Sequence, residues 1–104
     1  MKADLIVALD ISKAADAVAV VNKLPPEVTW YKIGLELFCA EGPPVIQLLR
    51  SRKKSIFLDL KLHDIPRTVE RAVKAAAQHG VEMLTIHACG SRAMLRAAVD
   101  AARS

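Results

Sequence analysis

The segment SIFLDLKLHDIPRTVERAVKAAAQHGVEMLTIHA, residues 55–88, decides the fold of this chain. Its first and last eight residues are largely apolar and predict strands over 55–62 and 81–88. Between them, residues 66–80 predict a helix that has Pro66 in its first turn and ends at Gly80. Strands that alternate with helices pair in parallel, so the segment predicts a βαβ unit.

The same pattern extends to both sides of this unit. Further strands are expected over 5–9 and 28–37, and further helices over 42–54, over 91–104 with Ser91 as N-cap, and from Ser12 as N-cap to the pair Pro25–Pro26. The order is therefore strand, helix, repeated four times. Because the strands are nearly continuous apolar runs, we expect a parallel α/β sheet that is covered on both faces.

Composition limits the protein class. The 104 residues contain no linker and predict a single domain over 1–104. The sequence has no run of 18 apolar residues, so we expect no membrane span. The net charge is +4, and the cationic run 50–54 has no aromatic neighbours, so a solvated helix end is expected rather than a nucleic-acid surface. Cys39 and Cys89 form neither a disulfide framework nor a zinc-ligand pair by spacing, so we expect a reduced, cytoplasmic protein.

Each expected strand carries a polar residue near its carboxyl end: Asp10, Lys32, Asp59 with Lys61, and His87. Because side chains alternate along a strand, Asp59 and Lys61 share the face opposite their leucine neighbours. Burying a lone charge costs roughly several kcal/mol unless it is paired. Ligands of parallel α/β folds bind beyond the carboxyl ends of the strands. These residues therefore predict a functional site.

Taken singly, several of these residues have ordinary structural interpretations. Asp10 could simply leave a strand or cap a helix, Lys32 could extend to solvent, and His87 could be a satisfied core histidine. His87 with Cys89 is only weak evidence for metal ligation. Asp64 could simply cap the next helix, whose positive end favours a negative charge. Asp64 together with Asp59 and Lys61 favours function, because a structural ion pair does not need three charges at strand ends.

The segment DLKLHDIPRTV, residues 59–69, resembles the Asp-x-Lys-x-x-Asp motif of the orotidine 5'-phosphate decarboxylase family. IVALD (6–10), YKIGLELF (31–38) and LTIHACG (84–90) resemble the first, second and fourth strands of that family. The resemblance implies a (β/α)8 TIM barrel, of which this chain would form the N-terminal half. Metal-dependent sugar-phosphate relatives carry an acidic residue where this chain has Lys32, so the resemblance implies an enzyme without metal or cofactor.

The resemblance also implies roles for the residues of this chain. Asp10 and Lys32 would contact the ribose hydroxyls or the charges beneath them. Asp59 would lie against the substrate carboxylate, and Lys61 would give a proton to C6 of the pyrimidine as carbon dioxide leaves. These residue types suit the chemistry, because a fixed ammonium stabilises and protonates a carbanion-like carbon.

Four more positions complete the expected site. The resemblance implies that Asp64 joins the array from the other subunit of a dimer, and that Ile65 and Thr68 enter the same neighbouring site. It places His87 near the ribose of the substrate, orotidine 5'-phosphate.

Four βα units are half of the eight that a complete barrel needs. We therefore expect the uncovered inward face to favour self-association into a homodimer or higher oligomer, with two half-barrels completing one barrel. The expected members of this face are Ile6, Ala8, Trp30, Phe57 and Thr85. A catalytically silent half-barrel that serves only in assembly is the alternative function, and a metal-dependent sugar-phosphate lyase is a weaker third.

Overall fold

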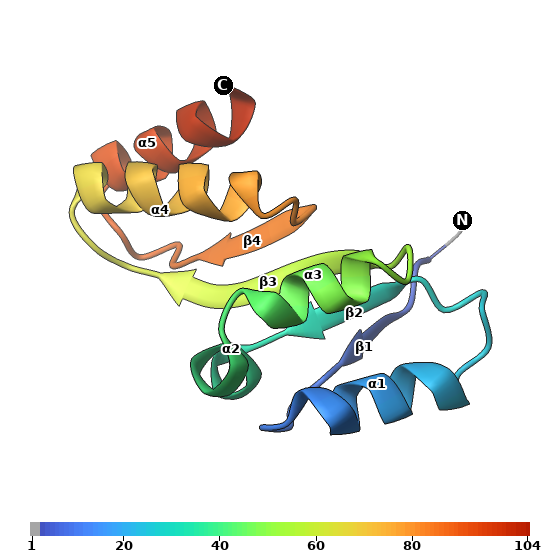
Figure 1. The fold of residues 1–104 in the computed structure, drawn as a ribbon. Helices are drawn as coiled ribbons and strands as arrows, with labels where there is room; N and C mark the ends of the chain where they lie inside the picture. Colours follow the sequence, from blue (N-terminus) through green and yellow to red (C-terminus); the bar gives the residue numbers. More distant parts are fainter. Residues whose placement is uncertain (1–2) are drawn as a thin grey trace.

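Four parallel strands form the sheet of the computed structural model, which describes residues 3–104 (Figure 1). Their order in space is their order in sequence: β1 (Ile6–Ala8), β2 (Trp30–Ile33), β3 (Ser55–Leu62) and β4 (Met83–Ile86). Five helices connect or follow them: α1 (Ala14–Lys23), α2 (Leu35–Glu41), α3 (Pro44–Arg50), α4 (Pro66–Gln78) and α5 (Arg92–Arg103). This confirms an α/β chain with half the strands of an eight-stranded barrel.

The helices cover one face of the sheet. Aligned residues of β1, β2 and β3 point toward them, as Val7, Tyr31 and Ile56 do. The largest core contains these strand residues and buried side chains of α1 to α4, among them Ala17, Val21, Leu37, Val45, Ile46, Leu49 and Ala76. Burial of this apolar surface is the main stabilising term of the fold.

The opposite, inward face of the sheet is open. It carries Ile6, Trp30, Phe57 and Met83, of which Ile6 and Met83 are exposed while Trp30 and Phe57 are half-buried. The expectation of a sheet covered on both faces is therefore wrong for this chain. Apolar strands are needed on both faces of a closed barrel, and the sequence alone does not show which face lacks its cover.

A second, smaller core joins α4 to α5. It contains Val69, Val73, Met94, Ala98 and Ala101, and Leu62, Leu84 and Ile86 pack against it. The side chain of Ser91 accepts a hydrogen bond from the Met94 amide at 3.0 Å, which confirms the predicted N-cap of the last helix. No helix of residues 3–104 is both long and apolar enough to cross a membrane.

The expected strand over 28–37 is wrong in its second half. β2 ends at Ile33, and α2 begins after Gly34 and continues to Glu41. Leu37 lies fully buried on the inner side of this short helix. A run of apolar residues at this length fits a strand and a helix equally well, and tertiary packing of Leu37 decides between them.

Several further boundaries differ from the prediction. The strand expected over 81–88 covers only Met83–Ile86, and α4 ends at Gln78 with His79, not Gly80, as its C-cap. Ser12 is not the N-cap of α1, because Lys13 has that position and the carboxylate of Glu41 accepts a hydrogen bond from the Ala14 amide at 2.5 Å. The helix expected over 42–54 ends at Arg50. Lys53 then adopts a left-handed φ of +62° before β3, which a continuous helix excludes.

Candidate active site

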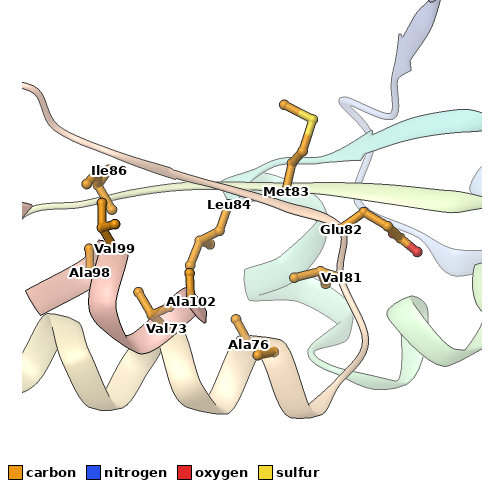
Figure 2. Close-up of a pocket in the computed structure, with 11 residues that line it drawn as sticks. Val73, Ala76, Val81, Glu82, Met83, Leu84, Ile86, Ala98, Val99 and Ala102 are labelled. Atoms are coloured by element: carbon orange, nitrogen blue, oxygen red, sulfur yellow. The ribbon is translucent and has the colours of Figure 1, made fainter. Parts of the chain in front are cut away.

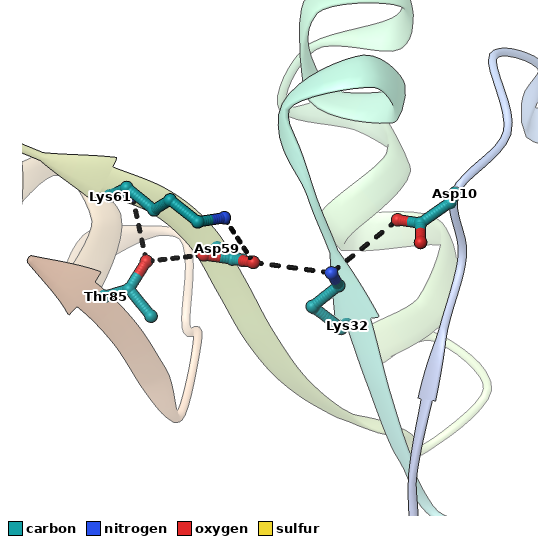
Figure 3. Close-up of polar contacts among 5 residues, drawn as sticks. All are labelled: Asp10, Lys32, Asp59, Lys61 and Thr85. Atoms are coloured by element: carbon teal, nitrogen blue, oxygen red, sulfur yellow. Dashed lines mark hydrogen bonds and ion pairs between the residues drawn. The ribbon is translucent and has the colours of Figure 1, made fainter.

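Four charged side chains form a continuous row at the carboxyl ends of β1, β2 and β3 (Figure 3). Lys32 Nζ lies 3.7 Å from Asp10 Oδ1 and 3.4 Å from Asp59 Oδ2, and Lys61 Nζ lies 2.9 Å from the same Asp59 oxygen. We call Asp10, Lys32, Asp59 and Lys61 the charge array. Its signs alternate, so each charge has an opposite neighbour.

Asp59 is the centre of the charge array and its most buried member, with 6% of the residue exposed. Burial alone would raise the pKa of its carboxyl group. Hydrogen bonds from Lys61, Thr85 and Lys32 outweigh this effect and hold the pKa below its ordinary value. Asp59 is therefore an anion fixed between two ammonium groups, of which Lys61 is the more exposed.

An irregularity in β3 positions Lys61. The register between β3 and β4 shifts between Leu58 and Leu62, and Lys61 has a left-handed φ of +51°. Such a backbone is strained for a residue with a side chain, and strain of this kind gathers at functional sites. It brings the ammonium of Lys61 back onto Asp59, so the regular alternation expected for β3 does not hold at its end.

Thr85 of β4 contacts the charge array, although it was expected only as a member of the inward face. Its hydroxyl donates to Asp59 Oδ1 at 2.8 Å and accepts the amide N–H of Lys61 at 2.9 Å (Figure 3). It thus replaces the backbone partner that Lys61 loses at the irregularity. A threonine two residues before His87 on an apolar strand was the available signal.

Asp64, Ile65 and Thr68 lie apart from the charge array in this chain. All three are exposed at the start of α4, and Asp64 Oδ1 accepts a hydrogen bond from the Ile65 amide at 2.7 Å. Asp64 is not a helix cap, because Ile65 has that position. Their expected entry into a neighbouring subunit's site stays a prediction.

His87 follows β4 and is also exposed and outside the charge array. Its ring lies 5.0 Å from that of His63, and its Nδ1 is 3.7 Å from the sulfur of Cys89. His87 is thus not a satisfied core histidine. Its expected contact with ribose stays a prediction.

An apolar cavity of about 260 Å³ lies elsewhere, along β4 and between α4 and α5 (Figure 2). Its lining includes Val73, Leu84, Ile86, Ala98 and Val99, and no member of the charge array. It offers a single carboxylate, that of Glu82, which is bound to the Ile56 amide. The charge array, and not this cavity, is therefore the candidate active site.

This chain is similar to proteins of one named family. The model of the orotidine 5'-phosphate decarboxylase / HUMPS family matches residues 3–104. An orotidine 5'-phosphate decarboxylase of Nostoc sp. is 52% identical over 97 residues, covering 93% of this chain and 40% of the relative. One from Lawsonia intracellularis is 48% identical over 102 residues, covering 98% of this chain and 44% of the relative.

A crystal structure of orotidine 5'-phosphate decarboxylase from Lactobacillus acidophilus superposes with a TM-score of 0.88 at 40% identity. The match covers 96% of this chain and 45% of that structure. The chain thus spans less than half the length of these relatives. The family model matches residues 3–104 and the parallel half-barrel agrees with it, so the chain belongs to the orotidine 5'-phosphate decarboxylase / HUMPS family.

Proposed function

We propose that the charge array is the reaction centre of an orotidine 5'-phosphate decarboxylase, and that this chain supplies its first four βα units as one domain. The observation that carries the proposal is the buried anion of Asp59, held between Lys32 and Lys61 at the carboxyl ends of parallel strands. Similarity to named decarboxylases along nearly the whole chain favours an enzyme over a silent assembly module.

The proposed reaction converts orotidine 5'-phosphate to uridine 5'-phosphate and carbon dioxide. The bond between C6 and the carboxylate carbon breaks, and its electron pair stays on C6. The ammonium of Lys61 stabilises this charge, donates its proton to C6 and later regains a proton from solvent. Asp59 lies against the departing carboxylate and holds Lys61 in place through the 2.9 Å contact.

The remaining predicted residues bind the substrate. Asp10 and Lys32, which are 3.7 Å apart, continue the charge array toward the ribose hydroxyls, and His87 contacts the ribose from β4. Asp64, Ile65 and Thr68 are exposed and available to a neighbouring subunit. Lys32 stands where a metal-dependent sugar-phosphate lyase has a carboxylate, so the proposal needs no metal.

Self-association is part of the proposal. β1 and β4 are the edges of the sheet, and the apolar inward face between them is open at Ile6 and Met83. Two copies related by a twofold axis along the barrel would pair β1 of one copy with β4 of the other. The inward face of each copy would then be covered by the inward face of its partner. The proposal also keeps the cytoplasmic location that the sequence led us to expect.

Loss of orotidine 5'-phosphate absorbance tests the activity. We expect little or no turnover by the 104-residue chain and clear turnover by a hybrid in which the remaining length of the Nostoc relative follows Ser104. A correctly folded hybrid without turnover would overturn the decarboxylase assignment. Turnover by the chain alone at the hybrid's rate would overturn the need for the other half.

Sedimentation equilibrium at micromolar concentration tests the assembly. The chain is expected to sediment as a dimer or larger species, and Met83→Lys should shift it toward monomer by placing a charge on the covered face. Ala75→Lys, at an exposed position of α4, is the matched control and should leave the sedimentation unchanged. A folded wild-type monomer would contradict the assembly.

A further inference from the structure

Three metal-binding side chains meet outside the charge array. His63 follows β3, and His87 and Cys89 follow β4; one ligand atom of each lies within 4.8 Å of the other two. All three side chains are exposed, so no buried contact holds them together. The sequence separates His63 from the other two by more than twenty residues, and parallel pairing of β3 with β4 brings them to one end of the sheet.

The distances fit a tetrahedral ion. With Zn–S near 2.3 Å and Zn–N near 2.0–2.1 Å, tetrahedral angles place a sulfur and a nitrogen ligand about 3.6 Å apart. Cys89 Sγ lies 3.7 Å from His87 Nδ1. The third ligand atom needs to approach by at most about 1.5 Å, because it lies within 4.8 Å of the others and two nitrogen ligands of such an ion are about 3.3 Å apart.

The donor types select the metal. Two imidazoles and one thiolate favour Zn²⁺ over Mg²⁺ or Ca²⁺, which prefer oxygen ligands. Three protein ligands leave the fourth tetrahedral position open, as in zinc sites that bind water or a substrate group. His63 also lines an open pocket of about 520 Å³ with Asp64, Ile65, Pro66 and Ser91, so an exchangeable ligand has access from solvent.

We propose that His63, His87 and Cys89 form a Zn²⁺ site that joins the loop after β3 to the loop after β4. Binding converts the Cys89 thiol to a thiolate and releases its proton to solvent. The geometry of the site does not depend on the decarboxylase assignment, although bound zinc would occupy His87, which is proposed above to contact the ribose. Zinc bound here stabilises the chain, since the unfolded chain does not hold the three ligands together.

Two exposed cysteines make an internal test possible. The thiols of Cys39 in α2 and Cys89 are both free, but only Cys89 lies in the cluster. In the reduced 104-residue chain, Zn²⁺ is expected to slow alkylation of Cys89 by iodoacetamide and to leave Cys39 unaffected, as read by mass spectrometry of the two peptides. Equal protection of both cysteines, or of neither, would overturn the site.

Titration with Co²⁺ and Zn²⁺ tests the ligand set. The wild-type chain should bind one equivalent and show sulfur-to-cobalt charge-transfer absorption. Cys89→Ser should abolish that band. Each of the three variants Cys89→Ser, His63→Asn and His87→Asn should weaken metal binding by at least about tenfold, because even changes to residues that only surround metal ligands have effects of that size. Cys39→Ser and His79→Asn are the matched controls and should bind as wild type. Unchanged affinity in any cluster variant would refute the three-ligand site.

Discussion

Lys61 Nζ contacts Asp59 Oδ2 at 2.9 Å although the strand between them is irregular. On a regular strand the side chains of Asp59 and Lys61 would extend side by side from the same face, and nothing in the backbone would hold their charged groups together. The left-handed backbone of Lys61 and the hydroxyl of Thr85 hold the ammonium on the buried carboxylate instead. A preorganised charge of this kind needs no rearrangement during reaction.

Replacement of Lys61 by alanine tests its proposed role in proton transfer. In the hybrid that includes the remaining length of the Nostoc relative, Lys61→Ala should lower turnover by several orders of magnitude while circular dichroism stays unchanged. Lys74→Ala is the matched control, because Lys74 pairs with Glu70 on the exposed side of α4. A Lys61→Ala turnover within tenfold of wild type would refute the proton-donor assignment.

The low pKa of Asp59 predicts a dependence of stability on pH. Because the folded pKa lies below the ordinary value of 3.8, the carboxylate stabilises the fold above that pH, and this contribution is lost as pH falls through the folded pKa. Asp59→Asn should therefore unfold at lower urea than wild type at pH 7, and the difference should shrink below pH 4. A difference that is constant from pH 7 to pH 3 would contradict the assignment.

Tyr31 predicts a stabilising substitution. It is fully buried, its hydroxyl has no hydrogen-bond partner among the described residues, and burial raises the pKa of its phenol. Tyr31→Phe removes an unsatisfied polar group and keeps the ring, so the free energy of unfolding should rise by about 1 kcal/mol. Tyr31→Leu, which also loses the ring under Lys54, should be less stable than wild type. Destabilisation by phenylalanine would show that the hydroxyl has a partner.

Gly80 predicts a destabilising substitution. It has a φ of +82° directly after the last turn of α4, and an added Cβ would meet the guanidinium of Arg50. Gly80→Ala should lower the free energy of unfolding by roughly 1 kcal/mol or more, because alanine rarely adopts this backbone. The free energy of unfolding of Gly80→Asn should lie between those of the wild type and Gly80→Ala, since asparagine tolerates left-handed φ. Urea denaturation gives the order, and alanine as stable as glycine would contradict it.

Chelation tests the branch of the family. This position of β2 holds a lysine and not a metal-binding carboxylate, and the ammonium of Lys32 pairs with both Asp10 and Asp59. The hybrid's turnover should survive EDTA. A loss that Mg²⁺ restores would move the assignment to the metal-dependent sugar-phosphate lyases.

The sequence predicted the centre of the fold better than its margins. β3 begins and ends where expected, at Ser55 and Leu62, because a long apolar run flanked by charges and a proline leaves few alternatives. α2 was missed because its residues continue the apolar run of β2, and only the burial of Leu37 shows the turn into a helix.

The candidate site was predicted where residues meet through regular strands. Asp10, Lys32 and Asp59 follow from parallel pairing, which brings the carboxyl ends of neighbouring strands together. Thr85 and His63 were not predicted as site residues. Their positions depend on the irregular end of β3 and on the loop after it, and hydrophobic periodicity carries no information about either.

The only tryptophan of the chain, Trp30, lies half-buried on the open inward face described above. Its indole emission is therefore a built-in optical signal for whatever covers that face. Docking of a second copy, or of the missing strands of a longer relative, would remove water from the ring and shift the emission to shorter wavelength. The rate of barrel closure could then be followed by stopped-flow mixing without any added label.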